Sequence, residues 1–335
     1  MSPFLSAAFL PSALLGTLIL GPGSTPESGL PSSTPDMLFA SPTRFDHAGR
    51  IVAPVMIDGK GPFRFIIDTG ASSSTISPQL AATLGLTPTA LTATGQMTSQ
   101  TTMIVNGITG TQAVPAVSIG RLEAGDLVLQ QMQLPVIWAP LMAGADGILG
   151  IAGFRQESLF VDFRRNRVVI SRSMRAANRV GFDKVPATVL EGGLMAVKGR
   201  VGGIAVTAII DTGSERSLGN AALQSALYAK RDSGNAEMTA VYGATPDIAS
   251  GQIRLVPTIT LGPVNLANVT VVFGDFHIFQ VWDLLQHPAV IIGMDVLGTV
   301  DSLGIDYRRS EIYFETVERA RDPNFDQSAM RWRAR

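Results

Sequence analysis

The chain has 335 residues, a formal net charge of −1 and a sequence pI near 6.3. Its length exceeds the usual range of a single hydrophobic core, so we expect two domains. No basic excess attracts nucleic acid, and the absence of cysteine excludes thiol catalysis and disulfide frameworks. The three histidines, His47, His277 and His287, give little support to a zinc site. We therefore expect no metal and no cofactor, and catalysis by carboxylates or hydroxyls.

The N-terminal residues 1–40 differ in composition from the rest of the chain. Residues 4–20 form an apolar run, and a spacer rich in proline, glycine and serine follows it. The run is short for a membrane span of about 20 residues and resembles the apolar part of a secretory signal. No lysine or arginine precedes Arg44, so the positive region typical of such signals is missing. We expect an exported protein, periplasmic or extracellular, with a retained membrane anchor or a misplaced start codon as alternatives.

Short apolar runs separated by glycine, proline and asparagine turns dominate the chain from residue 41 onward. In "MIDGKGPFRFII" and "KGRVGGIAVTAII" a glycine-rich link joins two such runs, a pattern typical of a β-hairpin. The second run of each hairpin leads directly into an aspartate, Asp68 or Asp211. Apolar residues recur mostly at every second position and seldom at helical spacing, so the sequence predicts an all-β fold with short helices.

Several landmarks recur at the same distance from these two aspartates. A capped helix is expected after each of them, with Ser77 as the first cap and Asn220 as the second. An apolar pair followed by glycine lies further on, and its glycine falls 82 residues after the aspartate in both cases. The similar endings "LFVDFRRNRVVIS" and "LGIDYRRSEIYF" complete the match. We predict two copies of one unit, at residues 41–178 and 179–317, and a charged tail at residues 318–335.

Two aspartates, one from each unit, suit acid–base chemistry. Hydrolysis of a peptide bond needs a base that activates water and an acid that protonates the carbonyl oxygen or the departing amine. Two carboxyl groups that share one proton supply both roles, provided that they lie about 3 Å apart. The sequence therefore predicts a catalytic pair of Asp68 and Asp211 on a pseudo-twofold axis between the two units.

The two motifs resemble those of a known family. Asp68-Thr69-Gly70-Ala71 and Asp211-Thr212-Gly213-Ser214 resemble the active-site motifs of aspartic proteases, and Ile148-Leu149-Gly150 and Ile291-Ile292-Gly293 resemble their second-loop motifs. The chain is most similar to bacterial retropepsin-like aspartyl proteases, here with two tandem units arranged as in pepsin-like enzymes. The resemblance implies two β-barrel lobes with the active site between them. It also implies a monomeric catalytic unit and a polypeptide substrate in extended conformation.

The resemblance also implies roles for the residues beside the aspartates. Thr69 and Thr212 are expected to point across the lobe boundary and to bond the main chain of the other lobe. Gly70 and Gly213 let the backbone approach the carboxylates closely. The Ser214 hydroxyl is expected to donate to Asp211, which favours the charged form of that residue and makes Asp68 the protonated partner. Ser72 is an alternative donor to Asp68 that would remove this asymmetry.

A hairpin flap over the substrate is a further feature of the family. Tyr242-Gly243 resembles the Tyr-Gly of pepsin-like flaps, although that tyrosine belongs to the first lobe in those enzymes. In the first unit the expected flap, residues 91–103, contains Gly95 and no tyrosine. Three interpretations remain: the lobes have exchanged roles, both units carry flaps, or Tyr242 is a surface aromatic residue.

Two alternatives to a general endopeptidase fit the same sequence. One is an inactive or weakly active peptide-binding module of the same fold. The other is a protease dedicated to one partner. Both aspartates are intact, which favours catalysis over binding alone.

Overall fold

The computed structural model describes residues 41–42, 44–45, 49–87, 90–91, 97–98, 102–137, 142, 144–172, 181–229 and 237–316. All of them belong to a compact unit that spans residues 38–335. The apolar run, the charged tail, His47 and the predicted boundary near residue 178 lie outside the described residues. Among the described helices, none has the length and apolar character needed to cross a membrane.

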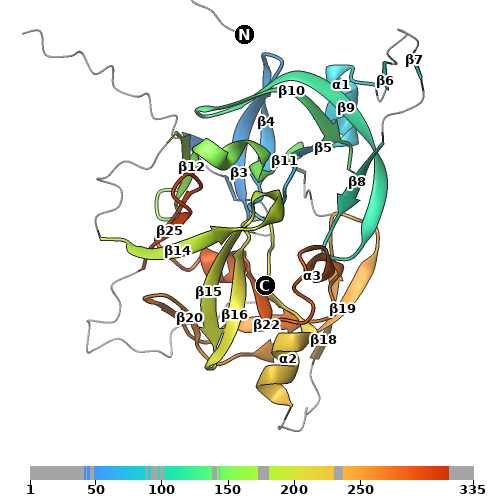
Figure 1. Ribbon diagram of the computed structural model, residues 1–335. Helices are drawn as coiled ribbons and strands as arrows, with labels where there is room; N and C mark the ends of the chain where they lie inside the picture. The colour runs from blue at the N-terminus through green and yellow to red at the C-terminus, as the bar shows by residue number, and fades with distance from the viewer. Residues whose placement is uncertain are drawn as a thin grey trace, which may run out of the picture. The chain divides into compact units, whose positions relative to one another are not determined.

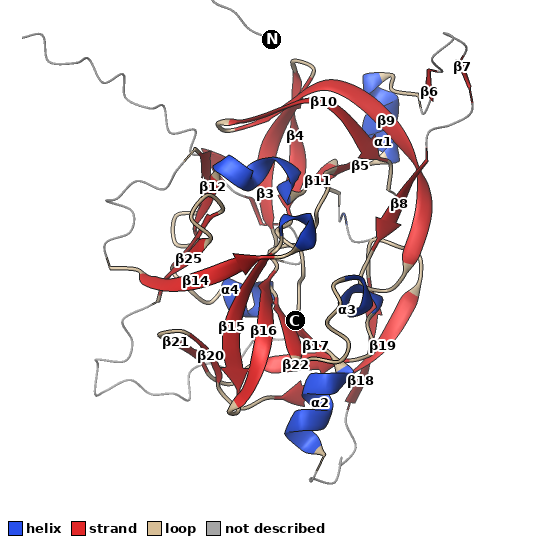
Figure 2. Ribbon diagram, viewed as in Figure 1, coloured by secondary structure: helices blue, strands red, loops and turns tan. Residues whose placement is uncertain are grey.

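The prediction of an all-β fold with short helices is confirmed (Figures 1 and 2). We call the described residues 41–172 the first lobe and residues 181–316 the second lobe. The elements of the first lobe are β1 (Ser41–Pro42), β2 (Arg44–Phe45), β3 (Ile51–Ile57), β4 (Lys60–Ile67), β5 (Thr75–Ile76), α1 (Pro78–Leu84), β6 (Ala90–Leu91), β7 (Met97–Thr98), β8 (Thr102–Asn106), β9 (Thr111–Ala124), β10 (Leu127–Pro135), β11 (Gly147–Leu149), the 3-10 helix η2 (Ile151–Gln156), β12 (Ser158–Asp162) and β13 (Arg167–Ser171).

The second lobe contains β14 (Asp183–Val189), the 3-10 helix η4 (Glu191–Gly193), β15 (Met195–Val201), β16 (Ile204–Ile210), β17 (Leu218–Gly219), α2 (Ala221–Tyr228), β18 (Glu237–Tyr242), β19 (Ile248–Leu255), β20 (Ile259–Leu261), β21 (Val264–Leu266), β22 (Thr270–Phe273), α3 (His277–Val281), β23 (Ala289–Ile292), α4 (Met294–Leu297), β24 (Ser302–Asp306) and β25 (Glu311–Glu315).

The internal repeat is visible in the strand pairing. In the first lobe β3 and β4 form an antiparallel hairpin, β11 runs parallel to β4, and β5 pairs antiparallel with β11. The second lobe repeats this arrangement with β15, β16, β23 and β17. Each aspartate therefore follows a strand that is paired on both sides, and buried strand ends of this kind hold a side chain in a fixed position.

The helix following each aspartate begins where the sequence predicts it. Ser77 Oγ accepts the Leu80 amide at 3.1 Å, and Asn220 Oδ1 accepts the Leu223 amide at 2.9 Å. These bonds satisfy amide groups that the first helical turn leaves free. Asn220 Nδ2 also donates to the carbonyl oxygens of Leu284 and His287, so the second cap ties α2 to the chain before β23.

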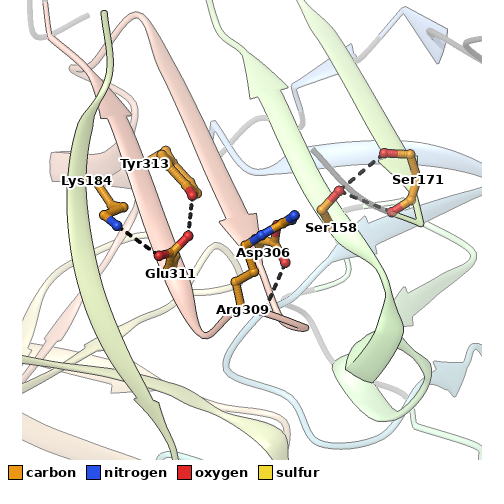
Figure 3. Close-up of polar contacts among 7 residues, drawn as sticks. All are labelled: Ser158, Ser171, Lys184, Asp306, Arg309, Glu311 and Tyr313. Carbon is orange, nitrogen blue, oxygen red and sulfur yellow. Dashed lines mark hydrogen bonds and ion pairs between the residues drawn. The ribbon is translucent and has the colours of Figure 1, made fainter. Parts of the chain in front are cut away.

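A sheet built from both lobes joins them. β12 of the first lobe pairs antiparallel with β24 of the second, and the order of strands is β1-β13-β12-β24-β25-β14. Figure 3 shows polar contacts along this sheet: Ser158 with Ser171, Lys184 and Tyr313 with Glu311, and Arg309 with Asp306. The Asp306 carboxylate is fully buried and accepts both the Arg309 amide (3.0 Å) and guanidinium (2.7 Å). Buried apolar residues of both lobes form one continuous core cluster around this sheet.

Candidate active site

Asp68 and Asp211 occupy equivalent positions in the two lobes. The Asp68 amide donates to the Leu149 carbonyl oxygen, and the Asp211 amide donates to the Ile292 carbonyl oxygen, both at 3.0 Å. Each aspartate is therefore fixed between the strand that precedes it and the parallel strand beside it. Asp211 is 5% exposed, whereas Asp68 is only partly buried.

The structure brings the two carboxyl groups together. Each accepts the amide of its own turn glycine, Gly70 at 2.9 Å and Gly213 at 2.8 Å. A Cβ atom on Gly70 would lie 2.4 Å from Asp211 Cγ, and one on Gly213 would lie 2.1 Å from Asp68 Cγ. Each carboxyl group thus packs on the glycine of the other lobe, so the two carboxyl groups lie close to each other across the lobe boundary.

Thr69 and Thr212 bind reciprocally across the lobe boundary. The Thr69 hydroxyl donates to the Ile210 carbonyl oxygen, and the Thr212 hydroxyl donates to the Ile67 carbonyl oxygen, both at 2.7 Å. Each hydroxyl also accepts the backbone amide of the other threonine, at 3.0 and 3.2 Å. Both side chains are buried, so these four bonds fix the spacing of the two active-site turns.

The expected bond from the Ser214 hydroxyl to Asp211 is wrong. This hydroxyl donates to the Arg216 carbonyl oxygen at 2.8 Å, and it is the Ser214 backbone amide that donates to Asp211 Oδ1, at 3.2 Å. The side-chain asymmetry from which we predicted a protonated Asp68 is therefore absent.

The electrostatic environment raises the pKa of both carboxyl groups. Burial raises the pKa of Asp211 well above its usual range, and the negative charge of Asp68 raises it further. Burial also raises the pKa of Asp68, but the hydrogen bond with Asp211 and the positive charge of Arg50 oppose that rise. Asp68 is also the more exposed of the two. Burial and the repulsion between the two negative charges therefore favour one proton on the pair.

Two serines support the site and were missed in the sequence. Ser74 Oγ accepts the Gly150 amide and Ser217 Oγ accepts the Gly293 amide, both at 3.1 Å. Each serine lies six residues after its aspartate, so the spacing of the repeat contained the signal. A Cβ atom on either glycine would lie within 2.6 Å of main-chain atoms of the active-site turn, which requires glycine there.

Both lobes carry a hairpin in the position of a flap. In the second lobe β18 and β19 form it, and in the first lobe β8 and β9 form it, with the turn at residues 106–111. Residues 91–103, where the first-lobe flap was expected, are described only in part, and Gly95 lies outside the described residues. Asn106-Gly107, a strong hairpin signal, marks the true turn.

The tips of these two hairpins touch each other (Figure 1). The hydroxyl groups of Thr109 and Thr245 lie 2.9 Å apart, and a Cβ atom on Gly243 would lie 2.8 Å from Thr109 Oγ1. Ile108, beside the first tip, packs against the apolar cluster of the second lobe. Thr111 Oγ1 lies 2.7 Å from His277 Nε2 on α3, so His277 links the first hairpin to the second lobe.

Tyr242 lies in the strand before the second tip, and its side chain is 53% exposed. It pairs across the hairpin with Ile248, which is 62% exposed. The neighbouring Val241 points to the opposite face and packs into the second-lobe cluster. The third interpretation, a surface aromatic residue, fits this placement of the tyrosine best, while Gly243 forms part of the contact between the tips.

No group of three or more histidine, aspartate or glutamate side chains that could hold a metal ion occurs among the described residues. The two carboxyl groups lie side by side. This arrangement suits acid–base chemistry on a bound water when one carboxyl group is neutral and the other is charged.

Comparison with known proteins gives the family. A model of the aspartyl protease family matches residues 53–152 and again residues 197–296, so the two matches together cover more than half of the chain. Each match includes one aspartate, its turn and the second-loop glycine. No curated protein matches the sequence. The chain belongs to the aspartyl protease family, of the retropepsin-like type, with two tandem units.

Proposed function

We propose that the protein is an aspartic endopeptidase, a hydrolase that cleaves peptide bonds with a water activated by Asp68 and Asp211. The observation that supports this proposal best is the close packing of the two carboxyl groups at the lobe boundary, each against the turn glycine of the other lobe. Burial of the pair keeps one proton on it over a wide range of pH. A neutral acid and a charged base are thus available at the same place.

In the proposed reaction, the charged Asp68 removes a proton from water as the water oxygen attacks the carbonyl carbon of the substrate. Asp211 gives its proton to the carbonyl oxygen, and a tetrahedral diol forms. Asp68 then returns its proton to the amide nitrogen as the C–N bond breaks, and Asp211 recovers a proton from the diol. One water is consumed, and a carboxylic acid and an amine are released.

The substrate that suits this site is a polypeptide in extended conformation. The two hairpins have main-chain donors and acceptors near their tips, which suits pairing with an extended chain. One chain supplies both aspartates, so we propose a monomeric catalytic unit that needs neither a metal nor another cofactor.

We also propose that the protein is exported, on the basis of the apolar run at residues 4–20. N-terminal sequencing of the protein from fractionated cells tests this. A periplasmic or secreted form that begins after residue 20 supports the proposal, and an intact N-terminus in the cytoplasmic fraction contradicts it.

Cleavage of a mixed peptide library between pH 3 and 8 tests the activity. The protein from residue 41 onward should cleave, and Asp68→Asn and Asp211→Asn should each lose at least about a thousandfold in kcat/KM, because a general acid and base contribute together. Asp126→Asn, at an exposed turn between β9 and β10, is the matched control and should keep full activity. A folded parent protein that binds peptides without cleaving them at any pH would instead indicate the binding module.

A further inference from the structure

Tyr307, directly after β24, has a buried hydroxyl group that the proposed mechanism does not use. Its side chain is 7% exposed, and the hydroxyl oxygen has no hydrogen-bond partner among the described residues. Buried hydroxyl groups almost always have a partner, and an ordered water serves where the protein supplies none.

The residue lies at the active-site loops although it belongs to the sheet that joins the lobes. Its ring centroid is 5.5 Å from that of Phe154 in η2, and its amide donates to the Glu157 carbonyl oxygen at 3.2 Å. The same 3-10 helix begins at Ile151, whose amide donates to the Ala71 carbonyl oxygen in the active-site turn. Tyr307 of the second lobe therefore packs on the 3-10 helix whose first residue is bonded to the Asp68 turn.

The phenol stays neutral throughout the range in which the aspartate pair titrates. Burial raises the pKa of Tyr307 above its ordinary value, and the negative charges of both Asp68 and Asp211 raise it further. A neutral phenol donates one proton, and its dipole turns that proton toward nearby negative charge.

Only one of the two repeat units has a hydroxyl group at this position. Asp306-Tyr307 in the second lobe corresponds to Asp162-Phe163 in the first lobe. Phenylalanine has the same ring and no hydroxyl group, so the ring suffices for packing at this position of the repeat. The oxygen of Tyr307 therefore adds something other than packing to one side of the site.

We propose that Tyr307 is a positioning residue for the aspartate pair, whose hydroxyl donates through one buried water toward Asp68 and Asp211 and stabilises their negative charge. The inference rests on the proposed function, because it assigns the residue a task in the chemistry of that pair. A donor that favours the charged form lowers the pKa values at which the pair titrates. Without it, the pair holds its protons to a higher pH.

Tyr307→Phe tests the proposal, since it removes the oxygen and leaves a ring that the repeat already accepts. We expect both limbs of the profile of kcat/KM against pH to move upward by about 0.5 to 1 unit, the effect of one net hydrogen bond. Tyr313→Phe is the matched control, because it removes a buried hydroxyl from the same sheet that donates to Glu311. Its pH profile should coincide with that of the parent protein.

An unchanged profile in Tyr307→Phe, or an equal loss of activity at every pH, would overturn the inference and leave Tyr307 a packing residue. Failure of the proposed function has a different signature, namely no cleavage by the parent protein at any pH. In that event the titration of the pair is measured through the pH dependence of the free energy of unfolding. Tyr307→Phe must then move that dependence to higher pH, and a coincident curve would contradict the proposal.

Discussion

Asp68 and Asp211 lie where folding must take two carboxyl groups out of water. Burial is the largest influence on both, and it opposes the ionised state. The glycines of the opposite turns leave room for the carboxyl groups, and the threonines hold the turns in place. The site thus holds the two carboxyl groups in a fixed geometry. Ionisation of the pair lowers the stability of the folded protein, because burial opposes it.

Asp211→Asn should be more stable than the parent protein, and the difference in free energy of unfolding should grow as the pH rises. A carboxyl group with a raised pKa in the folded state binds more protons there than in the unfolded chain, so stability falls as the pH rises above the ordinary value near 4. Asparagine resembles the protonated acid and removes this loss. The gain in free energy of unfolding should be absent near pH 3 and grow by up to about 1.4 kcal/mol per pH unit.

Urea denaturation at a series of pH values measures this difference. Asp275→Asn provides the comparison, because that side chain is exposed and its substitution should leave the pH dependence unchanged. A gain that is equal at pH 3 and pH 7 would mean that the asparagine acts through packing and not through the charge of the pair.

The sequence predicted the positions of this site better than its hydrogen bonds. The spacing of the repeat located both aspartates, their threonines and their glycines, because these lie in consecutive positions of one turn. The bond of the Ser214 hydroxyl depends on which of two nearby acceptors it faces, and sequence order contains no such information. The influence of Arg50 on Asp68 depends on a tertiary approach between residues 18 positions apart.

Among the elements, the two flap hairpins differ most from the sequence-based expectation. The short runs "TMIV" and "TQAVPAV" on either side of Asn106-Gly107 form the first hairpin, although Pro115 within the second run weakens its resemblance to a strand. The hairpins close on each other through their tips and through Ile108. If the hairpins act as flaps over the aspartate pair, we expect a polypeptide to enter only after this contact opens.

A disulfide between the tips should therefore act as a lock. In Thr109→Cys/Thr245→Cys the new thiols replace two hydroxyl groups that are 2.9 Å apart, and the chain contains no native cysteine to compete. We expect the oxidised protein to lose cleavage of polypeptides and the reduced protein to regain it. Each single cysteine variant, treated with the same oxidant, should remain active. Full activity of the oxidised double variant would show that substrates enter by another route.

On the scale of the whole molecule, the two lobes are joined by a β-sheet that continues from one lobe into the other. β12 and β24 pair over their full length across the boundary, and the Thr69 and Thr212 hydroxyl groups take part in four further hydrogen bonds between the lobes. The family and the all-β class were evident from sequence, whereas this continuous sheet was not. Its formation depends on pairing between strands that are more than a hundred residues apart, which local patterns do not encode.

Thr69→Val should consequently weaken both lobes together. It leaves the Ile210 carbonyl oxygen and the Thr212 amide without their partners, and two such buried losses lower the free energy of unfolding by about 2 to 4 kcal/mol. Thr69→Ser keeps the hydroxyl and should lose less than about 1 kcal/mol. Hydrogen exchange in β4 and β16 should show equal loss of protection, with Thr83→Val in α1 as an exposed control. Loss confined to the first lobe would show that the lobes unfold separately.

The covalent joining of two similar halves has a consequence for how the site can bind the proposed peptide substrate. A peptide has a direction, with different groups to the left and right of the bond to be cut, whereas a site made from two identical subunits presents the same side chain twice. Here the matched positions already differ: Ala71 corresponds to Ser214, and Phe163 corresponds to Tyr307. Because one gene encodes both halves, each half can change alone, so the site can become asymmetric in the way that a directional peptide substrate requires.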